Sequence, residues 1–556
     1  MKFSRRSFLL GSASAGLLAW AGFSLKKKAS PEKISGSLQG ANFHLGHRLR
    51  EGNFPPPSEF LDSEVVIAGG GMAGLSAAWK FKRSAFDRFT LLELEDSVGG
   101  NSQSGENAVS PYPWGAHYVP LPSPESHLVR ELFEELGVIE GYDEQQRPRY
   151  NEYFLCADPE ERLYRYGEWQ EGLIPFSGNG SEEKRQFEAF LRTVEGFKSA
   201  HGNDGKRAFA IPMEYSSRDP RFLELDAKTM AQWMKENGWD TPTLRWYVNY
   251  CCRDDYGTSY DQVSAWAGIH YFASRVSPSA NAAGATLVTW PEGNGWLVKK
   301  LREKVAEKIR PRSLVFRVAR KEKGAEVDFF DPHSQKSTRV TCRALVYAAP
   351  RFTVPHTFPE FQKEPPSYLN RFTYAPWMVA NVTLSEIPGG KGAPLAWDNV
   401  IYGSDSLGYV VATHQNLKSH PKETVITYYY PLSESDPVSE RKKAYATSVE
   451  EWKARVLKEL HAVHPELKGK VKNVDAWLWG HGMIRPIPGF VWGPERQAAL
   501  KPLPPVFFAH SDMSGLSLFE EAQFRGVSAA EDLMRHLKID FKPSIDPTDF
   551  GKEAHG

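Results

Sequence analysis

The chain has 556 residues, and its 68 Lys plus Arg balance 68 Asp plus Glu, for a formal net charge of zero. A chain of this length predicts two intertwined domains, or one domain with large insertions, rather than a single small core. The balanced charge gives no overall field favouring DNA, RNA or an anionic membrane, so we expect no nucleic-acid partner. The four cysteines form no C-x-x-C pair, so the sequence predicts no metal site.

The N-terminus carries the stretch SRRSFLL at residues 4–10. Two adjacent arginines before Phe-Leu are typical of a twin-arginine export signal, and the apolar segment that follows is weak and short for a membrane span. We therefore expect residues 1–28 to be a signal or anchor read by the twin-arginine translocase. The protein would then work in the periplasm or at the outer face of the inner membrane. Residues 29–60 show little periodicity, which predicts a linker or an extended arm.

Residues 63–79 predict a strand, a glycine-rich turn and a helix. An apolar run leads into the G-x-G-x-x-G motif formed by Gly69, Gly71 and Gly74. Gly69 permits a tight turn, Gly71 lets the backbone approach a pyrophosphate, and Gly74 lets the helix pack close to the strand. The free N–H groups at the helix start, at Met72 and Ala73, would face the phosphates.

A second strand is predicted at residues 90–93, ending at Glu93, 19 residues after Gly74. A carboxylate at this place accepts hydrogen bonds from the adenosine ribose hydroxyls. Its charge would repel a 2′-phosphate, which disfavours NADP.

Glu93 also opens the stretch ELEDSVGGN at residues 93–101. This stretch resembles the E-x-x-x-x-x-G-G-R signature of the flavin-containing amine oxidase superfamily, which also includes phytoene-desaturase-like enzymes. The resemblance implies FAD as cofactor, with Gly99 and Gly100 passing close to the flavin and its phosphates. Asn101 stands where the family has arginine, so a cation near the cofactor is missing.

Two further stretches are similar to this family. WGAHY at 114–118 resembles the loop that runs beside the isoalloxazine ring. The resemblance implies that Gly115 and Ala116 contact the cofactor and that His117 contacts flavin or substrate, unless His117 is an ordinary loop histidine. In the predicted strand at 313–318, Val315 would offer its backbone to adenine, or be an ordinary sheet valine.

The C-terminal part resembles the closing motif of the family. PVFFAHSD at 505–512 is followed by EAQFRGVSAAE at 521–531. The resemblance implies that Asp512 binds the ribityl–pyrophosphate region. It also implies a close-approach glycine at Gly526 and, from Val527, the start of a helix that faces the N1–C2=O edge of the flavin. The motif lacks the cysteine of thioether-linked flavins, so we expect non-covalent FAD.

The implied fold class is α/β, with a discontinuous Rossmann-type FAD-binding domain and an α+β substrate domain that contains an antiparallel sheet. The FAD-binding domain would comprise residues 61–135, 285–355 and 495–540, the substrate domain residues 136–284 and 356–494, and a tail residues 541–556. The apolar patterns add elements of the following kinds. Helices are predicted at 126–136, 227–237 and 448–463, and strands at 377–384, 409–413 and 424–430.

The resemblance implies oxidation of an amine or polyamine by hydride transfer to flavin N5. The family often has a lysine on the strand at 372–382, and Val379 or Ala380 fills that place. In the family this lysine orients the water that assists reoxidation of the flavin. Its absence favours a quinone or another acceptor over oxygen, and both oxygen and a quinone remain open as electron acceptor.

Three residues are candidates for the chemistry. His481, between two glycines, is the leading candidate for a catalytic or orienting residue, and His117 is the second. Asp254 is a candidate for binding a cationic amine, although it could also form a salt-bridge cluster with Arg253. Trp477 and Trp479 alternate, as strand residues of one face do, and fit either core packing or an aromatic cage.

Two other functions remain open. One is an FAD-dependent desaturase or isomerase of an isoprenoid or lipid, which would need a long apolar tunnel. The other is a flavoprotein scaffold that binds a partner and turns nothing over.

Overall fold

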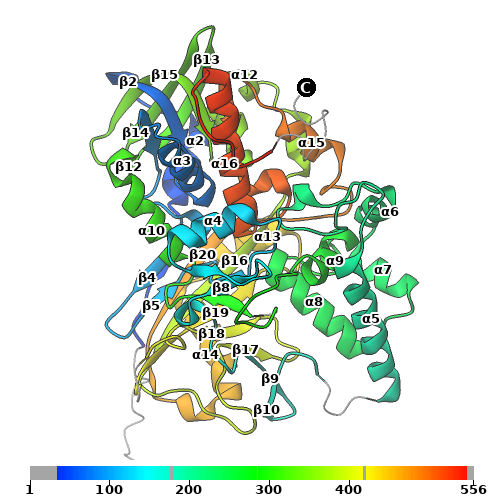
Figure 1. The fold of residues 1–556 in the computed structure, drawn as a ribbon. Coiled ribbons are helices and arrows are strands. Elements are labelled where there is room, and N and C mark those ends of the chain that lie inside the picture. The colour runs from blue at the N-terminus through cyan, green and yellow to red at the C-terminus, as the bar shows by residue number, and fades with distance from the viewer. Residues whose placement is uncertain (1–33, 176–179, 285, 418–420, 547–556) are drawn as a thin grey trace, which may run out of the picture.

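The computed structural model describes residues 34–175, 180–284, 286–417 and 421–546, so the predicted export signal lies outside the described residues. Two large sheets organise the chain, one in the upper lobe of Figure 1 and one in the lower. Within the described ranges, no helix is both long enough and apolar enough to cross a membrane.

The sheet of the upper lobe is assembled from three separated stretches of the chain. It has the strand order β12-β3-β2-β15-β14-β13, and β21 also pairs with β15. Its strands are β2 (Pro57–Ala68), β3 (Phe89–Leu92), β12 (Ile309–Arg310), β13 (Leu314–Lys321), β14 (Gly324–Asp331), β15 (Lys336–Tyr347) and β21 (Val506–Phe508). On β2, Val65 and Ile67 belong to one core cluster, and Val66 and Ala68 to another. Both faces of β2 are therefore covered, which explains its continuous apolar run.

The longer helices that pack in the upper lobe include α3 (Met72–Arg83), α4 (His127–Glu135), α10 (Gly295–Val305) and α16 (Phe519–Leu537). α16 lies against α3 so closely that a Cβ added to Gly526 would come 2.1 Å from the carbonyl oxygen of Ala73. The structure confirms the helix expected at 126–136, which is α4.

The lower lobe is built on an eight-stranded, mostly antiparallel sheet with the order β1-β20-β16-β19-β18-β17-β9-β10. Its strands are β1 (Leu38–Gly40), β9 (Glu161–Arg165), β10 (Glu168–Glu171), β16 (Tyr374–Leu384), β17 (Asp398–Ile401), β18 (Gly408–Val411), β19 (Thr424–Pro431) and β20 (Val471–Ile484). The three strands predicted from sequence correspond to β16, β18 and β19. α14 (Val449–Val463), preceded by α13 (Pro437–Ala446), is the helix expected at 448–463, and its Trp452, Val456 and Leu460 pack into the core of this sheet.

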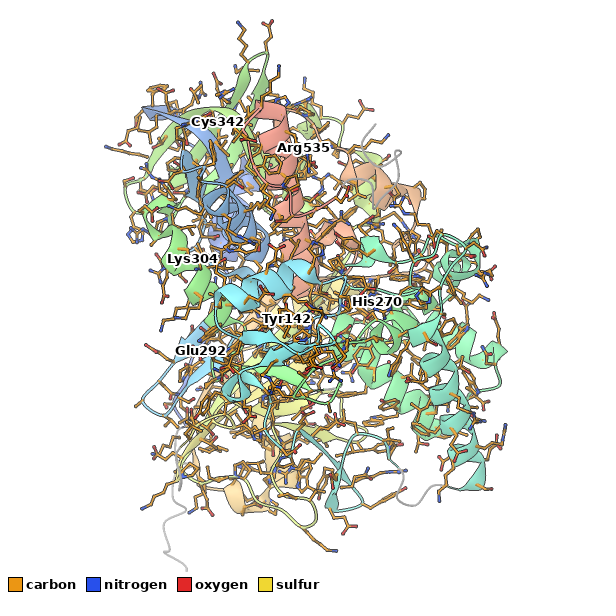
Figure 2. The ribbon with its side chains drawn as sticks, viewed as in Figure 1. Tyr142, His270, Glu292, Lys304, Cys342 and Arg535 are labelled. Carbon is orange, nitrogen blue, oxygen red and sulfur yellow. The ribbon has the colours of Figure 1, made fainter. Side chains whose placement is uncertain are left out.

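A helical layer flanks the two sheets, on the right of Figure 1. It contains α5 (Ser181–Ser199), α6 (Pro220–Leu223), α7 (Met230–Glu236), α8 (Pro242–Tyr256) and α9 (Ala265–Ala273). α7 is the helix expected at 227–237, capped by Thr229. His270 of α9, labelled in Figure 2, is fully buried in this layer, with Nε2 2.9 Å from the carbonyl oxygen of Ala210.

Short elements join the lobes. The paired strands are β4 (Ser104–Glu106) with β5 (Pro111–Pro113), β6 (Tyr118–Pro120) with β11 (Leu287–Thr289), and β7 (Ile139–Tyr142) with β8 (Pro148–Tyr150). The remaining short helices are α11 (Val354–Thr357), α12 (Pro359–Gln362) and α15 (Pro494–Leu500). Ile139 and Tyr150 belong to the core cluster of the upper lobe. The first boundary of the substrate domain, expected at 136, therefore falls too early.

Within residues 29–60, the described residues form an arm that packs on both lobes rather than a free linker, and the described residues of the predicted tail from 541 pack on the upper lobe. β1 pairs in parallel with β20, α2 (Phe43–Glu51) follows, and Phe54 stacks on Phe316 at 4.2 Å between ring centroids. At the other end, Ile545 is buried in the core of the upper lobe, and Lys80 donates to the carbonyl oxygen of Lys542. Both segments lack periodicity because they are held by a few long-range contacts rather than by a repeated apolar face.

Candidate functional site

The glycine-rich turn joins β2 to α3 and leaves an open face. Gly69 has φ +108° and donates to the carbonyl oxygen of Leu92 at 2.8 Å. Gly71 is the N-cap of α3 and makes no side-chain cap, so the N–H groups of Met72 and Ala73 begin the helix uncapped. A Cβ on Gly71 would come no closer than 4.0 Å to another heavy atom, whereas one on Gly74 would lie 1.9 Å from the carbonyl oxygen of Gly69. Gly74 is therefore needed for packing, and Gly71 leaves space beside a positive helix end.

Glu93 lies at the floor of this turn. Its carboxylate accepts hydrogen bonds from the N–H of Gly70 at 2.6 Å and from the N–H of Glu95 at 2.9 Å. Burial raises the pKa of Glu93 to about 7. The carboxylate thus fixes the turn, and its place at the end of β3 is the one predicted for a ribose ligand.

The second glycine pair lies directly against the first. Gly99 has φ +136°, Gly100 has φ +55°, and the N–H of Gly99 donates to the carbonyl oxygen of Gly70 at 2.8 Å. Asn101 follows, and its side-chain amide donates to the carbonyl oxygen of Gly482 on β20. Asn101 therefore connects the two lobes, a role that an arginine side chain reaching for a phosphate would not fill.

Two predicted cofactor residues occupy strand ends in the upper lobe. Val315 lies on β13 next to a register shift in its pairing with β14. Asp512 follows β21 and is buried, where its Oδ2 accepts from the N–H of Arg351 at 3.0 Å and from the hydroxyl of Tyr374 at 2.7 Å. The nearby His510 helps to lower the pKa of Asp512 against the effect of burial, so this carboxylate stays ionised.

The position predicted for the helix start at Val527 is wrong. α16 begins at Phe519, so Gly526 and Val527 lie in its interior, and Val527 is fully buried. The N–H of an interior residue is already bonded within the helix and cannot bind a ligand. Leu518, Phe519 and Glu520 form the helix start instead, and all three line a cavity.

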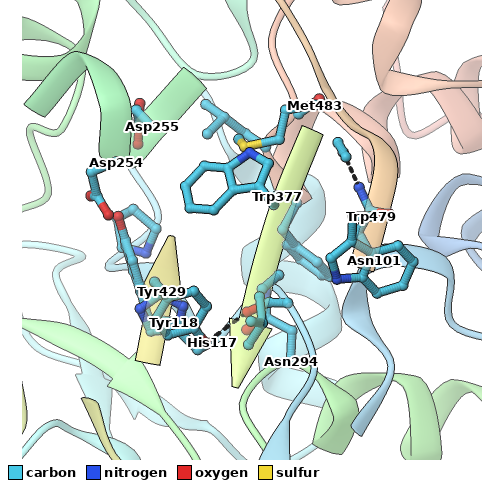
Figure 3. A pocket seen from close by; sticks show the side chains of 18 of the residues that line it. Asn101, His117, Tyr118, Asp254, Asp255, Asn294, Trp377, Tyr429, Trp479 and Met483 are labelled. Carbon is cyan, nitrogen blue, oxygen red and sulfur yellow. Dashed lines mark hydrogen bonds between the residues drawn. The ribbon is translucent and has the colours of Figure 1, made fainter. Parts of the chain in front are cut away.

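This cavity has a volume of about 140 Å³ and lies between the lobes. In Figure 3, Asp254 and Asp255 stand on one side of it and Asn101 and Trp479 on the other, with Trp377 between them. Gly115 and Ala116, predicted to run beside a flavin ring, line it as well. The full lining consists of Asn101, Gly115, Ala116, His117, Tyr118, Pro120, Asp254, Asp255, Arg275, Asn294, Trp377, Val379, Tyr429, Trp479, Gly482, Met483, Ser517, Leu518, Phe519 and Glu520.

Two of the three predicted catalytic residues line the cavity. His117 stacks on Tyr429 with ring centroids 4.5 Å apart, and burial lowers its pKa to about 4, so it is neutral near pH 7. Burial, and then the charge of Asp255, raise the pKa of Asp254 to about 7. Arg253, offered as its ion-pair partner, instead donates to the hydroxyl of Ser433 at 3.1 Å.

His481, the leading candidate from sequence, is not among the residues that line the cavity. Its ring stacks on Phe352 at 4.2 Å and lies 5.5 Å from Tyr374, and burial lowers its pKa to about 3. The cause is an irregularity in β20: Trp377 pairs with Trp479, whereas Ala375 pairs with Met483. The two extra residues on β20 break the alternation of its faces, so Trp479 and Met483 line the cavity without His481.

Of the two tryptophans of β20, one lines the cavity and the other packs in the core. Trp479 lines the cavity, and its indole N–H donates to the carbonyl oxygen of Trp114 at 2.7 Å. Trp477 packs against Trp114 with ring centroids 5.1 Å apart and does not line the cavity.

Sequence reasoning missed four polar residues of the cavity: Arg275, Asn294, Ser517 and Glu520. Glu520 is only 3% exposed, and burial raises its pKa to about 7. Asn294 is 1% exposed, and its Oδ1 has no hydrogen-bond partner among the described residues. Two adjacent acidic residues, Glu520 and Glu521, are typical of a helix start, and this pattern could have pointed to Glu520. Nothing in the sequence marks Asn294.

The glycine cradle, the uncapped helix and the unpartnered amide oxygen of Asn294 together fit a dinucleotide whose ring end enters the cavity. Residues 67–136 match the family model described as an NAD(P)-binding Rossmann-like domain. No curated protein is detectably similar in sequence.

Solved structures of similar fold cover most of the chain. Putrescine oxidase bound to putrescine is 15% identical with a TM-score of 0.62, over 86% of this chain and 100% of that one. Cyclohexylamine oxidase from Brevibacterium oxydans is 16% identical with a TM-score of 0.61, over 86% of this chain and 100% of that one. A CLA-producing fatty acid isomerase from P. acnes is 16% identical with a TM-score of 0.56, over 85% of this chain and 98% of that one. The chain therefore has the α/β fold of the flavin-dependent amine oxidases, with a Rossmann-like dinucleotide-binding domain.

Proposed function

We propose that this chain is an FAD-dependent oxidoreductase that oxidises an amine. The observation that carries the proposal is a cavity where the Gly115–Ala116 loop, the start of α16 and the acidic end of α8 meet. The dinucleotide cradle supplies one end of the site, and the carboxylates supply a place for a cation.

FAD would be held without a covalent bond. Gly71, Met72 and Ala73 would face the pyrophosphate, and Glu93 the ribose. Asp512, which follows β21 in the same lobe, would face the ribityl chain. When bound, FAD supplies an acceptor for the hydride that leaves the carbon next to the amine nitrogen.

The residues of the cavity would hold and orient the amine. Trp377 and Tyr429 provide aromatic walls, which attract a cation through their ring faces. Asp254 offers a carboxylate that forms no ion pair with a described cation, and neutral His117 adds no competing positive charge. The substrate is therefore drawn in by charge and kept from water by ring surfaces.

The electron acceptor is a further part of the proposal. Val379 lines the cavity where the family often has lysine, so the chain has no side-chain cation there to assist a reaction with oxygen. A quinone or another small acceptor fits this site better than oxygen does.

The decisive experiment is anaerobic titration of the purified yellow protein with separate panels of amines and lipids, followed at the flavin absorption band. Bleaching by amines alone supports the proposal, and a flavin that stays oxidised with every amine contradicts it. Bleaching by a fatty acid or isoprenoid would support the second candidate, a lipid isomerase or desaturase, which the likeness to the fatty acid isomerase favours. A flavin that neither panel reduces would indicate a scaffold.

We also propose that the protein is exported in folded form by the twin-arginine translocase to the periplasm or the outer face of the inner membrane. Arg5 and Arg6 before Phe8-Leu9 support this. The signal lies outside the described residues, so its support comes from sequence.

A further inference from the structure

α2 lies beside the part of the cofactor site assigned to adenosine. The backbone N–H of Asn42, at the start of this helix, donates to Oε1 of Glu95 at 2.7 Å. Leu45 of α2 belongs to one core cluster with Leu314, and Leu94 packs against that cluster. Leu94 and Leu314 are the chain neighbours of the two residues assigned to the ribose and the adenine. The helix therefore lies against the adenosine end of the site.

α13 brings a cation to the same region from the lower lobe. β1 ends opposite Leu478, and beyond that point two side chains bind carbonyl oxygens of β20. Arg441 of α13 donates to the carbonyl oxygen of Gly480 at 3.0 Å. Asn101 donates to the carbonyl oxygen of Gly482, and two residues of strand span at most about 7 Å. A guanidinium group thus lies beside the residue that stands where the family has arginine.

α2 and α13 are in contact, and α2 carries cations on the side that faces α13. Phe43 of α2 packs on Tyr445 of α13 with ring centroids 4.4 Å apart. The ring of His47 lies 5.5 Å from that of Phe43, one helical turn earlier. Arg50 follows His47 by three residues, so the two side chains share one face of the helix. Both therefore face the helix that carries Arg441.

Positive charge gathers here without carboxylate partners. Neither Arg50 nor Arg441 forms an ion pair with any residue that the structure describes. Burial lowers the pKa of His481 to about 3, and Arg441, Arg50 and His47 add to this effect, whereas Asp512 opposes it. Arg50 likewise adds to burial in lowering the pKa of Arg441. A bound anion would offset this mutual repulsion.

The cluster adjoins the end of the site assigned to the ribityl chain. The ring of His481 lies 5.5 Å from that of Tyr374, whose hydroxyl donates to Asp512 at 2.7 Å. α2 thus extends from the adenosine end, at Asn42, toward the ribityl end, at Arg50. In a flavin dinucleotide the two phosphates lie between these two ends.

From this placement we propose that Arg50 and Arg441 bind the phosphates of FAD and supply the positive charge that Asn101 lacks. The guanidinium group suits this task because its N–H donors match the oxygens of a phosphate. The N-terminal segment and the lower lobe would then close the cofactor site from outside the Rossmann-like domain. The inference rests on FAD as the cofactor of the proposed function, and it is independent of the substrate.

The test compares ligands with and without phosphate. Full-length protein freed of FAD is titrated with FAD and riboflavin, followed by flavin fluorescence, and with ADP, followed by calorimetry. We expect Arg50→Gln and Arg441→Gln each to weaken the binding of FAD and ADP about fivefold to twentyfold. The binding of riboflavin, which has no phosphate, should change less than about twofold. The affinity for FAD should also fall less steeply with salt concentration in either variant than in the parent.

Lys442→Gln is the matched control, because it removes the same charge from an exposed residue of α13. It should keep the affinity for FAD and ADP within about twofold of the parent. Unchanged affinity for FAD in both arginine variants overturns the inference. An equal loss for riboflavin and FAD overturns it as well, because it would indicate a structural role. Arg50 is exposed, so its variant tests the inference even if Arg441→Gln does not fold.

Failure of the proposed function gives a different result. A parent protein that binds FAD through both arginines but is reduced by no amine supports the phosphate site and contradicts amine oxidation. A parent protein that binds neither FAD nor ADP contradicts both.

Discussion

At the scale of single residues, two glycines of the dinucleotide motifs have different tasks that a substitution can separate. Gly71 has ordinary extended backbone angles and open space where a side chain would lie, whereas Gly526 touches the backbone of α3. We expect Gly71→Ala to leave the free energy of unfolding of the cofactor-free protein within about 0.5 kcal/mol of its original value. The same change should weaken FAD binding at least about tenfold, since the methyl group occupies the space kept for a pyrophosphate.

Gly526→Ala should behave in the opposite way. Its methyl group would overlap the carbonyl oxygen of Ala73, and overpacking of this kind costs about 1–3 kcal/mol. Gly196→Ala, on an exposed face of α5 with no neighbour within 4 Å, is the control and should stabilise by up to about 1 kcal/mol. Urea unfolding of the three variants measures these differences. A stable Gly526→Ala protein would contradict the close packing of α16 on α3.

Glu520 also makes stability depend on pH. Its pKa rises from an ordinary 4.5 to about 7 in the folded protein, so the folded state binds the proton more tightly than the unfolded state. Folding is therefore favoured below the unfolded pKa, and this advantage disappears as the pH rises from about 4.5 to 7. Glu520→Gln should flatten this part of the stability profile by about 3 kcal/mol. Thermal unfolding from pH 4 to pH 8 without ligand measures it, and parallel profiles of variant and parent would refute it.

At the scale of elements, the irregularity in β20 decides which side chains meet the substrate. His481 stacks on Phe352, while His117 faces the cavity beside Tyr429. We expect His481→Ala to lower the free energy of unfolding by about 1 kcal/mol and to change the KM for the amine less than twofold. His117→Ala should raise that KM several-fold. Steady-state kinetics of the two variants at one pH distinguishes the roles, and equal effects on KM would contradict the geometry.

At the scale of the whole molecule, the FAD site needs distant parts of the chain together. The glycine turn follows β2, Val315 lies on β13, and Asp512 follows β21. FAD can therefore be held only by a chain that has already folded. A translocase that carries folded proteins can export such a protein together with its cofactor.

We expect Arg5→Lys combined with Arg6→Lys to leave yellow, folded protein in the cytoplasm. Cell fractionation with absorbance and immunoblotting measures this, and export of the variant would contradict the signal. Lys26→Arg, which keeps the charge, is the control.

The family resemblance implied a discontinuous cofactor domain. Sequence patterns determined the dinucleotide turn and several of the regular elements. These features depend on local rules: Gly69, Gly71 and Gly74 follow a buried strand at fixed spacing, and α14 shows its apolar face in its own pattern. Only the tertiary structure decided that α16 begins at Phe519, that His481 does not line the cavity and that Glu520 does. It also showed that the segment 34–60 supplies a strand to the lower sheet and the beginning of a strand to the upper sheet. These outcomes depend on strand register and on contacts between residues hundreds of positions apart, and no local pattern records them.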